Sequence, residues 1–149
     1  MDKSSVDMAR YTVNVVVHTL VWHADEMSLL LLQRANTGLM DGRYTLPGGH
    51  LKPGESMLDA AQREVQEEVG IVLGDTTPTC VLPYAGGVNF VFESLRWTGE
   101  ARNMEPEKCV DLAWCPLERL PRNVVPWLRT VLDLRDSGRW FHDFSGNRS

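Results

Sequence analysis

The sequence predicts an α/β domain in which a mixed β-sheet is sandwiched between helices. The chain has 149 residues, the length of one domain of ordinary size. Hydrophobic residues make up 43% and charged residues 23% of it, close to the average of globular proteins, so the chain can bury a core. Segments with strand and helix patterns follow in the order strands, helix, strands, helix, which indicates helices packed on a sheet.

The N-terminal part of the chain contains the first predicted strands. Residues 1–9 are expected to form a flexible tail, and residues 10–149 a single domain. β-branched residues predict a strand over Tyr11–Val21. A short polar turn follows, and Met27–Arg34 (MSLLLLQR) is predicted to pair with this strand in a hairpin.

A loop-rich stretch then leads into the first helix. Residues 35–43 contain turn residues, and Tyr44–Leu46 is at most a short strand. The sequence PGGHLKPG of Pro47–Gly54 is not expected to form regular structure. A helix is predicted over Ser56–Val69, because its opening serine starts an S-x-x-D capping pattern. Gly70 is expected to end this helix.

The second half of the chain repeats the change from strands to helix. Ile71–Leu82, Val88–Trp97 and Val110–Cys115 have the composition of strands. A second helix is predicted over Asn123–Ser137, with its opening asparagine as the N-cap, a proline in its first turn and Gly138 after its end.

Charge and cysteine content limit the function classes. The net charge of −5 argues against a protein that grips nucleic-acid backbones, since such proteins need clustered Lys and Arg. The three cysteines contain no CxxC pair, which favours free thiols in a reducing cytosol. The apolar run Val13–Trp22 is interrupted by polar residues and is too short to span a bilayer. We therefore expect a cytoplasmic protein with no membrane partner.

The first predicted helix carries an acidic cluster. On a helical wheel, Glu64, Glu67 and Glu68 gather within an arc of roughly 100°. Like charges three and four residues apart destabilise a helix by about 0.2–0.5 kcal/mol per pair, so the cluster favours a compensating cation. Carboxylate ligands suit Mg²⁺ or Mn²⁺. A solvated acidic face is the simpler alternative for the cluster alone. The core-facing stripe of the same helix is expected to contain Leu58, Val65 and Val69, with Ala61 at its edge.

The residues before this helix favour a ligand site over a solvated face. Gly48, Gly49 and Gly54 bracket a tight loop that leads into the helix N-terminus. Glycines let backbone N–H and carbonyl groups approach a ligand closely. The alternative is a plain connection between a strand and a helix, so the loop and the acidic cluster are stronger evidence together than apart.

Together, residues 49–71 (GHLKPGESMLDAAQREVQEEVGI) resemble the signature of the Nudix hydrolase family, G-x5-E-x7-R-E-U-x-E-E-x-G-U, where U is apolar. No position departs from this pattern. The resemblance extends over roughly residues 11–137. The matching residues are Gly49, Glu55, Arg63, Glu64, Val65, Glu67, Glu68, Gly70 and Ile71.

The resemblance implies a Nudix-type α/β/α sandwich and a MutT-like pyrophosphohydrolase that uses Mg²⁺ or Mn²⁺. It implies metal binding by Glu64, Glu67 and Glu68, helped by the carbonyl of Gly48. Glu55 would support the site, as would Glu107 of the late loop, for which an exposed loop is the alternative. Arg63 points away from the acidic side on the wheel and would pair with a motif glutamate to hold it in place.

The reaction implied is attack of water at phosphorus in a nucleoside di- or triphosphate, or in a nucleoside diphosphate linked to another group. Metal ions neutralise pyrophosphate charge and acidify water, and a carboxylate takes the proton. The base is left open between Glu64, Glu67 and a glutamate of the late loop, Glu105 or Glu107. The number of metal ions is also left open.

Substrate contacts are less clearly indicated by the sequence. Arg34 and Gly49 are expected near the phosphates, and Trp127 is expected to stack on a base, with Trp97 and Trp114 as other aromatic candidates. A place in the core is the simpler alternative for each tryptophan, and a surface position at a strand end is the alternative for Arg34. The identity of the nucleotide and the oligomeric state stay open, a homodimer included. Two alternatives have the same fold: a non-catalytic module that senses nucleotides or binds a partner, and an enzyme of another reaction type such as isoprenoid isomerisation.

Overall fold

The computed structural model describes residues 10–146, so the expected tail at residues 1–9 and the end of the predicted domain at 147–149 lie outside the described residues. Within the described part, no helix is both long and apolar enough to cross a membrane. The strands are β1 (Asn14–Val21), β2 (Ser28–Arg34), β3 (Tyr44–Thr45), β4 (Gly48–His50), β5 (Val72–Leu73), β6 (Thr76–Tyr84), β7 (Gly87–Ser94), β8 (Trp97–Thr98) and β9 (Cys109–Pro116). The helices are α2 (Met57–Val69), the short 3-10 helix η1 (Leu117–Arg119) and α3 (Pro126–Ser137).

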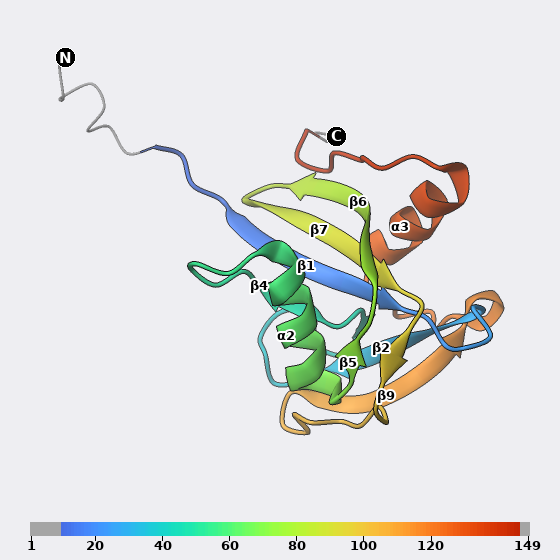
Figure 1. Cartoon of the computed structure of the whole chain (residues 1–149). Coiled ribbons are helices and arrows are strands. Elements are labelled where there is room, and N and C mark those ends of the chain that lie inside the picture. Colours follow the sequence, from blue (N-terminus) through green and yellow to red (C-terminus); the bar gives the residue numbers. More distant parts are fainter. Residues whose placement is uncertain (1–9, 147–149) are drawn as a thin grey trace, which may run out of the picture.

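A four-stranded mixed sheet forms the centre of the fold (Figure 1). Its order is β4-β1-β7-β6, with β1 and β7 parallel and the outer pairs antiparallel. A second, antiparallel sheet has the order β3-β2-β9, and β5 pairs with β8. The α/β fold class with a mixed sheet is therefore confirmed.

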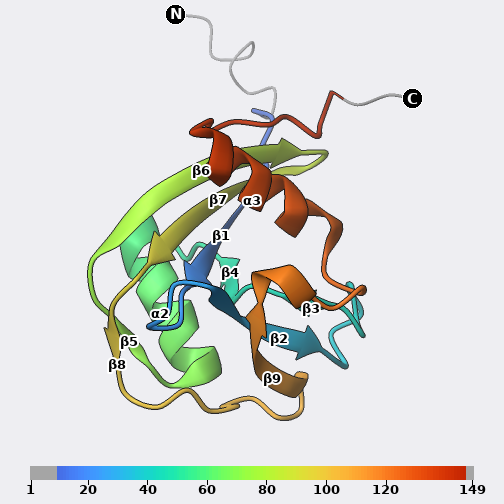
Figure 2. The same cartoon turned by 90° about the vertical axis from the view of Figure 1, so that its right-hand side faces the viewer.

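The helices α2 and α3 lie on opposite sides of the four-stranded sheet (Figure 2). Ala60 and Ala61 of α2 pack with Val17 and Phe92 on one face. On the other face, the α3 residues Leu128, Val131 and Leu134 join Leu20, Leu82 and Val91 in the main core cluster. Successive strand residues point to opposite faces, so one strand supports both layers.

The predicted hairpin of the first two long strands is wrong. β1 and β2 share a single bridge, Trp22 to Leu29, after which they enter different sheets. The physical reason is that the run Leu29–Leu32 is buried on both faces. Leu29 and Leu31 pack into the main core cluster. Leu30 and Leu32 point to the other face and pack into a second cluster against α2.

The glycine stretch forms a strand where irregular structure was expected. Gly48–His50 pairs with β1 as its antiparallel edge neighbour, and Gly48 lies opposite His18. A Cβ atom at Gly48 would lie 2.1 Å from the carbonyl oxygen of Val17. This close approach explains why glycine is needed there, although its backbone is not left-handed.

Other strand boundaries also differ from the prediction. β1 begins at Asn14, and β9 begins one residue earlier than expected. The predicted strand Ile71–Leu82 divides into β5 and β6, and Val88–Trp97 divides into β7 and β8. Both divisions occur where the chain leaves the large sheet to form the β5–β8 pair.

The caps of α2 agree with the prediction, but its buried face differs by one position. The Ser56 hydroxyl accepts a hydrogen bond from the backbone N–H of Asp59 at 3.0 Å, and Gly70 is left-handed with φ 75°. Leu58, expected on the core-facing stripe, is 44% exposed, whereas Ala60, which was not part of that stripe, is fully buried. The helix packs closely on β1 and β4, so a small residue suits this position.

The helix α3 begins later than predicted, at Pro126. Its N-cap is Val125, which has extended backbone angles. The residue before a proline is disfavoured in helical conformation, so the helix cannot extend further toward the N-terminus. The Asn123 side chain, expected to cap the helix, donates instead to the carbonyl oxygen of Gly42 at 2.6 Å.

Candidate active site

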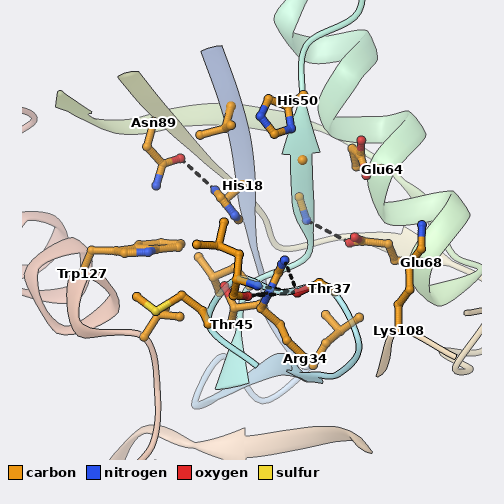
Figure 3. Close-up of a pocket in the computed structure, with 18 of the residues that line it drawn as sticks. His18, Arg34, Thr37, Thr45, His50, Glu64, Glu68, Asn89, Lys108 and Trp127 are labelled. Atoms are coloured by element: carbon orange, nitrogen blue, oxygen red, sulfur yellow. Dashed lines mark hydrogen bonds between the residues drawn. The ribbon is translucent and has the colours of Figure 1, made fainter. Parts of the chain in front are cut away.

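A cleft of about 1050 Å³ lies on the α3 side of the four-stranded sheet, between the acidic face of α2 and the start of α3 (Figure 3). Asn14, Val16, His18, Leu82, Tyr84 and Asn89 from β1, β6 and β7 form its floor. Glu64, Glu67 and Glu68 border one end and Trp127 and Phe144 the other, and we call this space the cleft.

Glu68 is the acidic side chain held most tightly against the sheet. Its Oε1 accepts a hydrogen bond from the backbone N–H of Gly48 at 2.9 Å. Burial of the carboxyl group raises the pKa of Glu68 to about 8, and the negative charges of Glu64 and Glu105 act in the same direction. The bond from Gly48 and the charge of Arg34 oppose this rise. A carboxylate in such a place gains from a nearby cation.

Arg63 connects the acidic residues in one ion-pair network. Its guanidinium contacts Glu55 at 2.7 Å, Glu64 at 3.0 Å and Glu67 at 3.1 Å. The wheel placed Arg63 away from the acidic side, but its long side chain reaches back across the helix. The bonds from Arg63, with the Lys52 backbone N–H, lower the pKa of Glu55 to about 2. The same bond to Glu55 raises the pKa of Arg63 above its ordinary value.

Gly49 is required by the position of Glu64. A Cβ atom on Gly49 would lie 2.5 Å from one carboxylate oxygen of Glu64 and 2.8 Å from the other. Any larger residue would therefore displace the carboxylate from β4. Burial raises the pKa of Glu64, while its bond to Arg63 opposes the rise.

The acidic cluster is not assembled as a ready-made metal centre. Within residues 10–146, no three His, Cys, Asp or Glu side chains converge as a group that could hold a metal ion. Arg63 holds Glu64 and Glu67, and Gly48 holds Glu68. The donor chemistry fits a hard cation, since carboxylate oxygens are the ligands that Mg²⁺ and Mn²⁺ prefer. The metal-ligand roles stay a prediction.

The basic side chains of Arg34 and Lys108 line the cleft. Arg34 donates from Nε to the carbonyl oxygen of Leu39 at 2.8 Å and from Nη2 to the hydroxyl of Thr37 at 3.1 Å. These bonds fix Arg34 against the loop that follows it (Figure 3). The positively charged side chains of Arg34 and Lys108 can therefore contact a negatively charged ligand group that binds near Glu68.

Of the predicted aromatic contacts, Trp127 alone lines the cleft in residues 10–146. Its ring centroid lies 4.7 Å from that of His18, with the planes tilted by 54°, and the side chain also packs against the main core cluster. Trp97 and Trp114 stack on each other at 5.4 Å in the second core cluster. Their expected alternative role as core residues therefore fits their position.

His18 and Asn89 form a polar pair in the cleft floor. His18 Nδ1 and Asn89 Oδ1 are 2.8 Å apart. Burial lowers the pKa of His18 to about 4, against the raising effect of the bond to Asn89. The imidazole is therefore neutral at neutral pH.

Comparison with known proteins places these features in a family. The model of the NUDIX domain matches residues 12–134, which includes the whole acidic network and the cleft floor. The chain belongs to the NUDIX family. It resembles the MutT NUDIX hydrolase from Burkholderia pseudomallei, with 27% identity and a TM-score of 0.77, over 83% of this chain and 98% of that one.

Two further proteins are similar to this chain. The MutT protein from Methanosarcina mazei has the same fold, with a TM-score of 0.75 and 20% identity, over 87% of this chain and 97% of that one. The nucleoside triphosphatase NudI of Salmonella schwarzengrund is 41% identical over 56 residues. That match covers 36% of this chain, and the chain spans 40% of the length of NudI.

The NUDIX signature predicts the residues at the acidic end of the cleft. Several other residues that line the cleft were not predicted from the sequence. Glu105 of the late loop lines the cleft, but Glu107, predicted as a supporting residue, does not. The carbonyl of Glu107 accepts a bond from Asn36 at the loop surface. His18 and Asn89 were missed. The sequence feature that could have identified these two residues is a polar residue inside an otherwise apolar strand.

Proposed function

We propose that this Nudix chain is a metal-dependent pyrophosphohydrolase that cleaves an anhydride bond in a nucleoside di- or triphosphate, or in a nucleoside diphosphate linked to another group. The observation that carries the proposal is one cleft with the Arg63–glutamate network at one end and Trp127 at the other. The name of NudI, a nucleoside triphosphatase, supports the same substrate class.

The acidic end would hold the cation. Glu64, Glu67, Glu68 and the carbonyl of Gly48 are the proposed ligands for Mg²⁺ or Mn²⁺, as the family resemblance implies. A bound cation would neutralise pyrophosphate charge and make water more acidic. The fit rests on three carboxylates, of which Glu64 and Glu68 have pKa values raised by burial.

The residues of the chain would divide the remaining tasks. Arg34 and Lys108 lie in the cleft where they can pair with phosphate oxygens. A water oxygen forms a bond to phosphorus, the bridging P–O bond breaks, and its electron pair leaves with the departing phosphate. A carboxylate takes the proton of the attacking water. Glu64, Glu67 and Glu105 are the candidates for this base, and Glu107 is no longer one because it lies outside the cleft.

The apolar end would hold the nucleoside. Binding sites for small molecules usually combine apolar walls with a few polar groups. Trp127 offers an aromatic surface at the border of the cleft, and Leu82 and Phe144 line the same space. The net charge of −5 supports a small phosphorylated substrate over a nucleic-acid backbone.

A substrate panel tests the proposal. The chain would be incubated with Mg²⁺ and nucleoside triphosphates, ADP-ribose, dinucleoside polyphosphates or nucleotide sugars, and released phosphate and pyrophosphate would be measured. We expect hydrolysis of at least one class, with release that depends on Glu68. Binding of nucleotides without hydrolysis of any class would instead support a nucleotide-sensing module and contradict the proposal.

A further inference from the structure

The cleft floor contains a buried amide with one free end. The Asn89 side chain belongs to a residue that is 4% exposed, and it lines the cleft on β7. One end of its amide bonds to His18 Nδ1 at 2.8 Å. Within residues 10–146, the other end has no hydrogen-bond partner, and Figure 3 shows it turned toward the end of the cleft that Trp127 borders. The buried side-chain atoms without a partner in the described residues are the Thr19 and Thr79 hydroxyls, so the free end of the Asn89 amide is accessible from the cleft. A ligand in the cleft can therefore hydrogen-bond to it.

The bond between Asn89 and His18 can be made in two ways. In the first, His18 Nδ1–H donates to the amide oxygen, and the amide NH₂ faces the cleft. In the second, the imidazole proton is on Nε2, the amide NH₂ donates to Nδ1, and the amide oxygen faces the cleft. The second needs a neutral imidazole, because Nδ1 must accept, and the lowered pKa of the buried His18 makes this form available at neutral pH. Each arrangement places the opposite hydrogen-bonding group toward the ligand.

We propose that Asn89 reads the exocyclic group of the substrate base, and that His18 acts as a positioning residue whose tautomer sets which end of the amide faces that base. This inference rests on the proposed nucleotide substrate. An amino group on the base, as in cytosine or adenine, donates to the amide oxygen. An oxo group, as in uracil or hypoxanthine, accepts from the amide NH₂. The pair therefore admits both kinds of base without discriminating strongly between them.

The location of the pair agrees with this role. His18 lies under the Trp127 ring, and Asn89 lies beside His18 on the neighbouring parallel strand. A base packed against Trp127 would present its edge to the sheet floor, where Asn89 is the buried amide. The acidic end contains carboxylates, cations and backbone groups, which recognise metal and phosphate but carry no information about a base.

The experiment measures binding, so that it does not depend on hydrolysis. Non-hydrolysable α,β-methylene triphosphates of cytidine, uridine, adenosine and inosine would be titrated in the presence of Mg²⁺. The wild-type chain should bind the amino and oxo members of each pair with Kd values within about fivefold. Asn89→Asp can only accept at this position, so it should weaken the oxo members relative to the amino members by roughly tenfold or more.

The tautomer provides a readout that a purely structural role would not change. In ¹⁵N NMR of the wild-type chain, His18 should carry its proton on Nε2 with the cytidine analogue and on Nδ1 with the uridine analogue. Ser94→Ala is the matched control, because Ser94 is a buried polar residue of the same strand outside the cleft. It should leave both the Kd ratios and the tautomers unchanged.

The outcomes separate this inference from the proposed function. The inference is overturned if the ratio of Kd values for the amino and oxo analogues in Asn89→Asp stays within twofold of the wild-type ratio. It is also overturned if His18 has the same tautomer with both analogues. In either case the wild type could still hydrolyse nucleotides. A shifted ratio and a switched tautomer would support the inference even if the wild type hydrolysed none of the corresponding natural nucleotides, a result that would count against the proposed function alone.

Discussion

Arg63 grips Glu55 with two parallel hydrogen bonds, from Nε to Oε2 at 2.7 Å and from Nη2 to Oε1 at 2.9 Å. This fork leaves Nη1 free to contact Glu64 at 3.0 Å and Glu67 at 3.1 Å. Glu55 therefore fixes the guanidinium, and the guanidinium in turn fixes two glutamates of the signature. Lysine has the same charge but cannot form such a fork.

Arg63→Lys should lower kcat by roughly tenfold or more with little change in KM, since it disturbs the carboxylates and leaves the nucleoside end intact. Steady-state kinetics on the best substrate of the panel would measure this. The matched control is Arg135→Lys, because Arg135 pairs with Glu93 at 2.7 Å outside the cleft. An equal loss of kcat in both variants would show that Arg63 has no special position.

Glu67→Gln and Glu68→Gln should each lower turnover by roughly two orders of magnitude or more, because each removes a proposed charged ligand. Both should stay folded, and loss of like-charge repulsion can stabilise the helix slightly. Glu100→Gln is the control, since Glu100 is an exposed glutamate outside the cleft. Turnover near that of wild type in either test variant would remove that residue from the proposed ligand set.

Trp127→Ala should raise KM by roughly five- to a hundred-fold, the loss expected for a stacked base of about 1–3 kcal/mol. Turnover should change less, because stacking is similar in the ground and transition states. Trp114→Ala is the comparison, because Trp114 stacks on Trp97 in the second core cluster. It should lower Tm and leave KM unchanged. A sharp fall in Tm for Trp127→Ala with constant KM would make Trp127 a core residue only.

The stability of the fold should depend on pH through His18. Burial, together with the charges of Arg34 and His50, lowers its pKa from 6.5 to about 4, so the folded chain binds this proton more weakly than the unfolded chain. The contribution of His18 to stability is therefore complete above pH 6.5 and is lost as pH falls from 6.5 toward 4. Urea unfolding at several pH values should show a smaller loss in His18→Gln. Identical pH profiles for the two proteins would contradict this.

The acidic end could be predicted from sequence because its information is local. The caps of α2 at Ser56 and Gly70 follow from short-range hydrogen bonding, and the signature places the three glutamates within about one turn of each other on this helix. The wheel failed for Leu58 and Ala60, because the tight packing of α2 on β4 is a tertiary property.

The base end of the cleft depends on contacts between distant segments. His18 and Asn89 are 71 residues apart and meet because β1 and β7 pair in parallel, a register that neither segment specifies alone. The same reason explains the failed hairpin: the apolar run of β2 fits a strand buried on both faces, and only the whole fold decides which sheet receives it. Glu105 and Glu107 also have similar local sequence, and the path of the late loop decides which of them lines the cleft.

If the chain is a metal-dependent pyrophosphohydrolase, removal of divalent cations must stop hydrolysis. Wild type and Glu68→Gln would be treated with excess EDTA and then supplied with Mg²⁺ or Mn²⁺, while phosphate and pyrophosphate release from the best substrate is followed. We expect wild-type hydrolysis to stop with chelator and to return with the cation, and Glu68→Gln to recover roughly a hundredth of that rate or less. Full wild-type turnover in excess EDTA would contradict the proposed metal dependence.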